Sequence, residues 1–360
     1  MTASVACVVD DAEQVLRNKI KLRLLLAGAD VESVDQLSFL ESEQAPAAAV
    51  SLLRKSLFWS SDELITISEL AQRSGLDVEL CRRARMLMGL PDPGEAALCR
   101  VEEAEAFGGF ALGMELFGVE PVLQFARVIG SALASVAEAS LSVFGRSLTE
   151  RADDSEAVVP VGDAYTLEVL DAVEAFQIVP MALQILSKLQ FDLVMDRLTE
   201  APGQPSFAAV GFVDLTGSTR ATAALGVDTM AAALTRFEEW SVELTVERGG
   251  RVVKYIGDEV MFLAPEILSA AEVATELIQR VGNDPILETA RAGVAYGSVL
   301  SRDGDYFGST VNLAARLVDK AKAGAVLLTG DGASDCPGAV AKGKRRLRDL
   351  PERVDIWRIG

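Results

Sequence analysis

The spacing of apolar residues divides the chain into two parts of different character. From residue 1 to about 200, apolar positions recur three and four residues apart, which is the period of an amphipathic helix. After residue 203 the pattern changes to short runs rich in Val, Ile and Phe that alternate with helical stretches. Between them, TEAPGQPSF holds two prolines and a glycine in nine residues, which indicates a linker. We therefore predict an all-α domain over 1–203 and an α+β domain over 204–360.

Two segments of the helical half are distinctive. Residues 165–198 form one long helical pattern that Pro180 should kink or split, and we expect 181–200 to be a helix that couples the two domains. Residues 65–91, ITISELAQRSGLDVELCRRARMLMGLP, have the helix, tight glycine turn and second helix of a helix-turn-helix, and look like the start of a MerR-type DNA reader. An ordinary helical hairpin used for packing is the alternative, and the acidic charge of the chain favours it.

Composition narrows the functional classes. The 360 residues carry a formal net charge of −19, so most of the surface should repel phosphate backbones and anionic lipid head groups. The N-terminus has no secretion signal, and the most apolar region, 106–145, is interrupted by charges. We expect a cytoplasmic protein with no nucleic-acid partner and no stable membrane insertion. Histidine is absent and the four cysteines form no CxxC pair, so chemistry must rely on carboxylates, amines, guanidinium groups and amides.

The first candidate site is the stretch VDLTGSTR, which follows an apolar strand. It places Asp214 at the end of the strand and then Thr216, Gly217, Ser218 and Thr219 before a helix rich in Ala and Leu. A carboxylate beside the N–H groups of a helix start can hold a hard cation and a polyphosphate together. The alternative is simpler: Ser218 or Thr219 caps the helix.

Two later stretches carry further polar residues in apolar surroundings. RVVKYIGDEVMFLA reads as two strands joined by a two-residue turn at 257–258, with Lys254 inside the apolar run, where an ammonium needs a partner. In DGDYFGSTVNLAARLVDK, a helix that begins near Ser309 would place Asn312 and Arg316 on one face, where they could hold a hydroxyl and a phosphate. A plain turn and a solvent-facing polar stripe are the alternatives.

Together the three stretches are similar to the class III nucleotide cyclases over roughly residues 205–360. The residue types of the adenylate-forming members fill six positions in register: Asp214, Lys254, Asp258, Asp305, Asn312 and Arg316. The resemblance implies a ferredoxin-like catalytic domain, and we expect an antiparallel-dominated sheet with helices on one face.

The resemblance also implies a metal and substrate set. Asp214 and Asp258, with the backbone carbonyl of Leu215, would hold two Mg²⁺ or Mn²⁺ ions in each active site. Lys254 and Asp305 would select the base. Adenine offers an acceptor at N1 and a donor at its exocyclic amine, which an ammonium and a carboxylate complement, so ATP is the expected substrate.

The remaining roles concern the ribose and the phosphates. By the same resemblance Asn312 would orient the ribose and Arg316 would stabilise charge on the α-phosphoryl oxygens. Arg291 lies where some relatives have an arginine that binds the triphosphate. Arg348 lies where relatives often have Lys followed by Gly, but here Asp349 follows it, and this departure puts a phosphate role for Arg348 in doubt.

One chain should not complete a site. Lys254 and Asp258 are four residues apart along an extended strand, about 13 Å, which is long for two groups on one compact nucleotide. In the family that the chain resembles, sites form between two catalytic domains arranged head to tail. Since all six positions are filled, a homodimer with shared sites is predicted, in which one chain gives Asp214 and Asp258 and its partner gives Lys254, Asp305, Asn312 and Arg316.

The layout of the helical half resembles soluble actinobacterial cyclases, including a pH-responsive group. We therefore expect 1–203 to be a regulatory and dimerising domain, which a proton or a small-molecule effector could address. Two other interpretations stay open. YIGDEV is similar to the GGDEF signature of diguanylate cyclases, although Ile256 and Val260 depart from it. The chain could also be a helix-turn-helix regulator whose cyclase-like domain senses a nucleotide.

Overall fold

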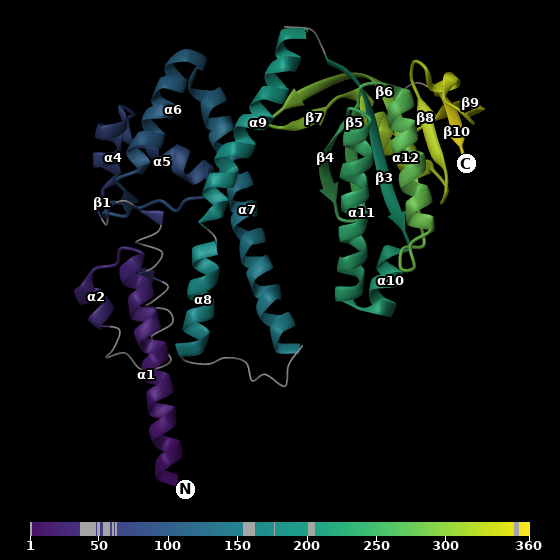
Figure 1. Cartoon of the computed structure of the whole chain (residues 1–360). Helices are drawn as coiled ribbons and strands as arrows, with labels where there is room; N and C mark the ends of the chain where they lie inside the picture. Colours follow the sequence, from purple (N-terminus) through teal and green to yellow (C-terminus); the bar gives the residue numbers. More distant parts are fainter. Residues whose placement is uncertain are drawn as a thin grey trace. The chain divides into compact units, whose positions relative to one another are not determined.

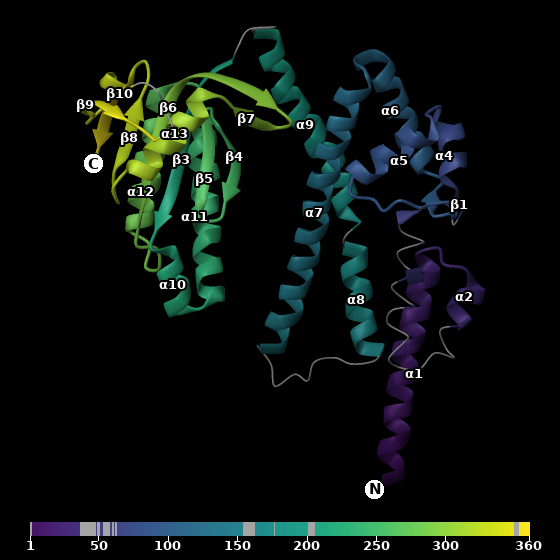
Figure 2. The same cartoon turned by 180° about the vertical axis from the view of Figure 1, so that it is seen from behind.

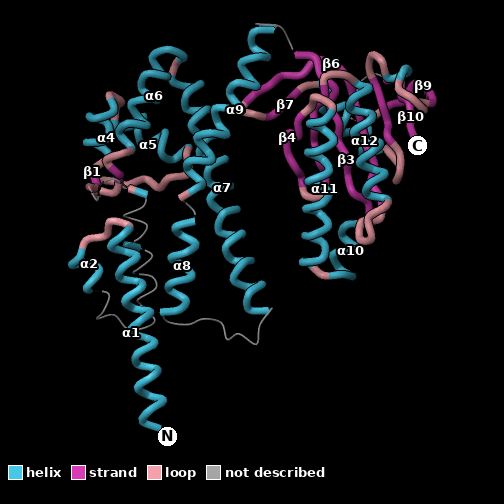
Figure 3. The backbone as a smooth tube through the Cα atoms, in the orientation of Figure 1, coloured by secondary structure: helices cyan, strands magenta, loops and turns pink. Residues whose placement is uncertain are grey.

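The computed structural model describes residues 2–36, 48, 51–52, 58–59, 61, 63–153, 163–175, 177–200, 206–348 and 353–360. It separates into two compact units, Met1–Glu200 and Ala201–Gly360. Figure 3 shows that the first unit is almost wholly helical and that the strands gather in the second. The change of sequence pattern near residue 203 thus lies close to the division between the units.

The first unit consists of helices and one two-stranded sheet. Its elements are α1 (Thr2–Leu26), α2 (Val31–Gln36), β1 (Leu64–Ile65), α4 (Ile67–Ser74), α5 (Val78–Leu87), β2 (Cys99–Arg100), α6 (Glu103–Phe117), α7 (Val119–Asp153), α8 (Asp163–Ala175) and α9 (Ile178–Glu200). The long helical pattern is split between α8 and α9, as predicted. Pro180 lies in the first turn of α9, where a missing N–H group breaks no helical bond.

The segment predicted as a helix-turn-helix has that geometry in α4 and α5. A capping box begins α4, since the Glu69 N–H donates to Thr66 Oγ1 at 3.2 Å and the Thr66 N–H donates to Glu69 Oε2 at 2.8 Å. Gly75, with φ of 78°, ends the helix in the left-handed conformation. Buried side chains of α4 to α7 form one core, so both helices pack within the unit; they include Leu70, Cys81, Phe107 and Leu123.

The second unit is a mixed sheet with helices. Its strands follow the order β4-β5-β3-β6-β8-β10-β9, with β7 on β6, and among the described residues neighbouring strands are antiparallel except β6 with β8. The elements are β3 (Ser206–Thr216), α10 (Ser218–Leu225), α11 (Val227–Glu247), β4 (Arg251–Ile256), β5 (Glu259–Ala264), α12 (Ile267–Gly282), β6 (Thr289–Arg302), β7 (Asp305–Phe307), α13 (Ser309–Lys320), β8 (Val326–Thr329), a 3₁₀ turn (Ala333–Asp335), β9 (Val340–Arg346) and β10 (Arg353–Ile359). The α+β class and the antiparallel-dominated sheet are confirmed.

Helices cover both faces of this sheet, so the expectation of helices on one face is wrong. Along β3, Ala209 and Val213 belong to the core shared with α11 and α12, whereas Val210 and Phe212 belong to the core shared with α13. Figure 1 shows α11 and α12 in front of the sheet, and Figure 2 shows α13 on the side seen from behind. The physical reason is that FAAVGFV is apolar at every position, as in a strand buried on both faces, rather than alternating.

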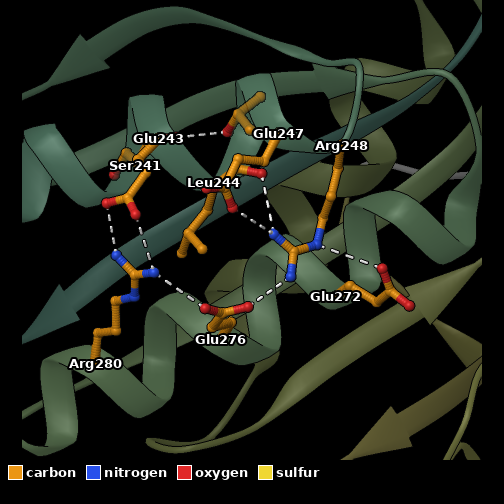
Figure 4. Close-up of polar contacts among 9 residues, drawn as sticks. Ser241, Glu243, Leu244, Glu247, Arg248, Glu272, Glu276 and Arg280 are labelled. Atoms are coloured by element: carbon orange, nitrogen blue, oxygen red, sulfur yellow. Dashed lines mark hydrogen bonds and ion pairs between the residues drawn. The ribbon is translucent and has the colours of Figure 1, made fainter.

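An ion-pair network ties α11 to α12 on the outer side of the unit (Figure 4). Glu276 of α12 accepts hydrogen bonds from Arg248 Nη2 at 2.5 Å and from Arg280 Nη2 at 3.1 Å. Arg280 also contacts Glu243 of α11 at 2.8 Å, and Arg248 contacts Glu272 at 3.4 Å. Arginine and glutamate side chains alternate along the network, so each carboxylate has a cation beside it.

Two helical stretches in the described part of the chain have the length and apolar composition to cross a membrane. They are Val119–Val143 and Thr166–Met195, and Phe176 within the second lies outside the described residues. Core helices of proteins that never meet a membrane share this length and composition. The expectation of no stable membrane insertion therefore stays a prediction.

Candidate active site

Asp214 lies near the end of β3, between the two neighbouring strands. The register places it opposite Glu259 of β5 and Arg291 of β6. Arg291 donates to Asp214 Oδ2 from Nε at 2.8 Å, and its Nη2 lies 2.7 Å from the same oxygen. The guanidinium thus holds the carboxylate in place, and a phosphate role for Arg291 stays a prediction.

Asp258 lies in the two-residue turn between β4 and β5, which confirms the predicted hairpin. Its backbone carbonyl accepts a hydrogen bond from the Leu215 N–H at 3.2 Å, and its carboxylate Oδ2 accepts one from the hydroxyl of Ser218. These contacts bring the turn against the end of β3. The side chain of Leu215 is buried in the core, so its backbone is the part that borders the site.

Glu259 is a member of this cluster that the sequence analysis missed. Burial raises its pKa to about 7, and the charges of Asp214, Asp319 and Asp258 act in the same direction while Arg291 opposes them. Several carboxylates therefore crowd one corner of the sheet, which favours a cation there. The sequence contained a signal for Glu259. A two-residue turn at 257–258 makes Glu259 the first residue of β5, which pairs with β3.

The turn after Asp214 differs from the expected helix cap. Gly217 is the N-cap residue of α10, with φ of 86° and no side-chain cap hydrogen bond. The Ser218 hydroxyl is directed to Asp258 instead, so the cap interpretation is wrong for Ser218. Thr216 Oγ1 donates to the Thr289 carbonyl at 3.1 Å. The backbone of Thr219 lies in α10, and its side chain is outside the described part of the structure.

Lys254 and Asp305 come together although they are 51 residues apart. Lys254 Nζ lies 2.5 Å from Asp305 Oδ2, and the Tyr306 N–H donates to Asp305 Oδ1 at 2.8 Å. Burial acts to raise the pKa of Asp305, but the Lys254 ammonium and the Tyr306 N–H outweigh it, so the pKa lies below its ordinary value. The carboxylate is therefore ionised at neutral pH and acts as an acceptor.

Asn312 and Arg316 lie one turn apart on α13, which begins at Ser309 as predicted. Asn312 is exposed, and Arg316 Nη1 lies 3.5 Å from Asp319 Oδ2. The Asp319 carbonyl accepts a hydrogen bond from Arg291 Nη1 at 3.2 Å, which links the end of this helix to the carboxylate corner.

Arg348 lies on a different part of the sheet from Asp214, which it was predicted to join at one active site. It follows β9, which is four strands from β3 in the order of the sheet, and it is exposed. Asp349 lies outside the described residues. A phosphate role for Arg348 stays a prediction.

The candidate site of one chain thus has two parts on the α13 face of the sheet. Asp214 shares a face of the sheet with Phe212, because residues two apart along a strand lie on the same face. Lys254 lies opposite Met261 of β5. Phe212 and Met261 both belong to the core beneath α13. The first part holds Asp214 and Asp258, and the second holds Lys254. Among the residues that the structure describes, no group of three or more His, Cys, Asp or Glu side chains is arranged to hold a metal.

Comparison with known proteins assigns the chain to a family. No protein-family model matches it. It is 31% identical over 327 residues to an adenylate cyclase of Streptomyces coelicolor, a match that covers 87% of this chain and 81% of the relative. The chain belongs to the class III adenylate cyclase family. A match of this length takes in much of the helical half, so this cyclase is of the actinobacterial type that its layout resembles.

The chain is also similar to other cyclases. The chain is 28% identical over 334 residues to the pH-sensitive adenylate cyclase of Mycobacterium tuberculosis, with 86% of this cyclase and 81% of the relative covered. The solved structure of an adenylyl cyclase from P. aeruginosa aligns with 44% of this cyclase and 95% of that chain, at 22% identity and a TM-score of 0.37.

Proposed function

We propose that this cyclase converts ATP to 3′,5′-cyclic AMP and pyrophosphate. Family membership supports the reaction class. The observation that carries the proposal is that the turn with Asp258 lies against the end of β3 beside Asp214, while Lys254 and Asp305 form a separate pair at 2.5 Å. The first suits a metal-bound triphosphate, and the second suits the edge of an adenine base.

The carboxylate corner fits Mg²⁺ or Mn²⁺ that arrives with a nucleotide. Mg²⁺ keeps several waters and commonly takes one or two carboxylates plus substrate phosphates, so it needs no third acidic ligand. Asp214, Asp258 and the Leu215 carbonyl are the proposed ligands. The pKa of neighbouring Glu259 is raised chiefly by burial, and the charges of Asp214 and Asp258 add to that rise. Two such ions, when bound, would lower the charge of the triphosphate and activate the ribose 3′-hydroxyl for in-line attack on the α-phosphorus.

The Lys254–Asp305 pair supports ATP over GTP. The ammonium donates to adenine N1 and the ionised carboxylate accepts from the exocyclic amine, whereas guanine presents the reverse pattern. Each mispaired buried group costs about 1 to 3 kcal/mol. If the cyclase prefers GTP under equal conditions, this assignment of Lys254 and Asp305 fails.

The active site is proposed to form between two chains. Asp258 lies in the turn two residues beyond the end of β4 rather than on an extended strand, and the β4–β5 pairing fixes its separation from Lys254, so we propose that the two residues serve different nucleotides. In the head-to-tail homodimer, the partner supplies Lys254, Asp305, Asn312, which orients the ribose, and Arg316, which stabilises charge on the α-phosphoryl group. Exposed apolar side chains near Lys254 and Asp305 offer a surface for the second chain: Ile256, Leu300 and Phe307.

Complementation between inactive variants tests the shared site. Asp214→Ala and Asn312→Ala should each be inactive, whereas a co-refolded equal mixture should recover about a quarter of the parent rate, since half of the dimers are mixed and each has one intact site of two. The assay is cyclic AMP and pyrophosphate release from ATP with Mn²⁺. A mixture that stays inactive while mixed dimers form would exclude this arrangement.

The helical half is proposed to regulate the catalytic unit through α9, residues 181–200 in particular. α9 ends at Glu200 and β3 begins at Ser206, so a change in α9 reaches the sheet through a short connection. The rate and the pH profile of the whole chain should therefore differ from those of residues 204–360 alone. Equal rates and equal profiles would count against regulation.

The arginines of the helix-turn-helix support a packing role rather than DNA reading. Arg82 contacts Asp92 at 2.8 Å, Arg83 contacts Glu120 at 2.8 Å, and Arg85 is buried against Glu103. Carboxylates of the same unit thus neutralise the positive charges that would attract phosphate backbones. Tight binding of DNA at physiological salt would revive the regulator interpretation.

A further inference from the structure

An ion pair beside the turn at 216–219 has no role in the mechanism above. Arg220, in the first turn of α10, contacts Glu288, which directly precedes β6, with 3.1 Å between Nη2 and Oε2. The Arg220 side chain is 80% exposed and that of Glu288 is 51% exposed. A pair this exposed adds little to stability. Its place beside the turn that contacts Asp258 through Ser218, and so beside the proposed triphosphate position, gives it another use.

Glu288 lies directly over Gly217. A Cβ added to Gly217 would lie 2.5 Å from Glu288 Oε2 and 2.8 Å from its carboxyl carbon, so the space of a side chain is filled by this carboxylate. The backbone on both sides is fixed, since Thr216 pairs with Thr289 at the end of the β3–β6 ladder and Thr216 Oγ1 donates to the Thr289 carbonyl. The carboxylate is therefore held against the turn that leads into α10.

A lone carboxylate in this place would oppose the proposed substrate. A triphosphate at the turn carries several negative charges, and Glu288 would repel it unless a cation lay between them. Arg220 is that cation. Its Nη2 bonds to Glu288, and because most of the side chain faces solvent, its other N–H groups can donate to a phosphate at the same time.

We propose that Arg220 binds the terminal phosphates of the nucleotide and that Glu288 positions its guanidinium over the turn. The proposal rests on the proposed function, because that function brings a metal-bound triphosphate to Asp214 and Asp258, and the turn at 216–219 lies beside them through the Ser218–Asp258 contact. Arg220 would then contact the substrate, and Glu288 would act only through Arg220. The ligand group is the β- and γ-phosphates, which leave as pyrophosphate.

The test compares Arg220→Gln with Arg280→Gln in the full chain. Arg280 belongs to the α11–α12 network, so its variant removes the same charge from the same unit away from the turn. Arg220→Gln should raise KM for ATP roughly tenfold and weaken inhibition by inorganic tripolyphosphate by a similar factor, with excess Mg²⁺ present. Inhibition by adenosine should not change.

A second pair of variants separates positioning from bulk charge. Glu288→Ala should raise KM severalfold, because the guanidinium loses its anchor, whereas Glu288→Gln should restore a KM near the parent value, because its amide oxygen can still accept from Arg220. A role limited to folding would move thermal stability in both variants and leave the ratio of the tripolyphosphate and adenosine inhibition constants unchanged.

Two results would overturn the proposal. One is an Arg220→Gln protein whose KM and tripolyphosphate inhibition match those of Arg280→Gln within twofold. The other is equal tripolyphosphate binding by the parent and Arg220→Gln in calorimetry. If the parent makes no cyclic AMP from ATP, the proposed function fails, and the calorimetric comparison still decides whether Arg220 binds polyphosphate.

Discussion

Gly293 lies where β6 and α13 approach closely, and its replacement by alanine should separate them. A Cβ at Gly293 would lie 2.3 Å from the backbone nitrogen of Val318 and 2.4 Å from the carbonyl oxygen of Ala314. These are backbone atoms of a helix, so no flexible side chain can move aside. Since non-bonded atoms settle near 3.5 Å, α13 must move outward by about 1 Å.

The shift has a cost in stability and a larger one in activity. Overpacking of a core commonly costs about 1 to 3 kcal/mol. α13 carries Asn312 and Arg316, and a displacement of about 1 Å in catalytic groups can lower a rate about 100-fold. Gly282→Ala is the matched control, because Gly282 lies at the end of α12 with nothing within 4 Å of an added Cβ. That variant should be neutral or slightly more stable than the parent.

Urea denaturation and the complementation assay together check the argument for Gly293→Ala. The variant keeps its carboxylate corner but misplaces α13, so in mixed dimers it should behave like Asn312→Ala. It should recover activity when mixed with Asp214→Ala and stay inactive with Asn312→Ala. A variant as stable and active as the parent, or one with the opposite complementation pattern, would refute the close-approach reasoning.

Three further variants test other parts of the catalytic unit. The Asp284 side chain is almost fully buried, and burial acts to raise its pKa. Hydrogen bonds from two backbone N–H groups and from Arg236 outweigh burial, so the pKa is lowered. The ionised carboxylate therefore stabilises the fold at neutral pH, and this stabilisation is lost as the pH falls through the lowered pKa. Asp284→Asn should lower the free energy of unfolding by about 2 kcal/mol near neutral pH, and the difference from the parent in denaturant titrations should narrow at acid pH. Arg248→Ala breaks the contact with Glu276 and should cost about 1 kcal/mol at low salt and less in concentrated NaCl, as measured by thermal unfolding. Lys254→Met should lower kcat/KM for ATP at least about tenfold in steady-state assays while changing stability by less than about 1 kcal/mol.

Local signals predicted much of the fold and the order of the site residues. The Gly-Asp pair at 257–258 marked a two-residue hairpin, and the structure joins β4 and β5 there. A helix that begins near Ser309 was the condition for Asn312 and Arg316 to share a face, and α13 begins there. These features depend on residues close in the sequence, so a single sequence contains them.

Features set by pairing across the sheet were not predicted. Ser218 looked like a helix cap because its sequence neighbourhood is that of a cap, but its hydroxyl is taken by Asp258, 40 residues away. Glu259 and Arg291 flank Asp214 only because β3 pairs with both β5 and β6 in one register. Helices on both faces could have been expected, since the continuous apolar run of β3 leaves no polar face.

The sheet also limits how the proposed site can be controlled. Lys254 and the turn that holds Asp258 belong to one hairpin, and β4 pairs with β5 along its length, so no movement within the catalytic unit can bring the two residues to one nucleotide without breaking that pairing. In the proposed homodimer, the approach of a second chain is what completes the site. A helical half that alters how two catalytic units meet would therefore change the number of complete sites and leave the chemistry within each site unchanged. Regulation of this kind should alter kcat per chain more than KM for ATP.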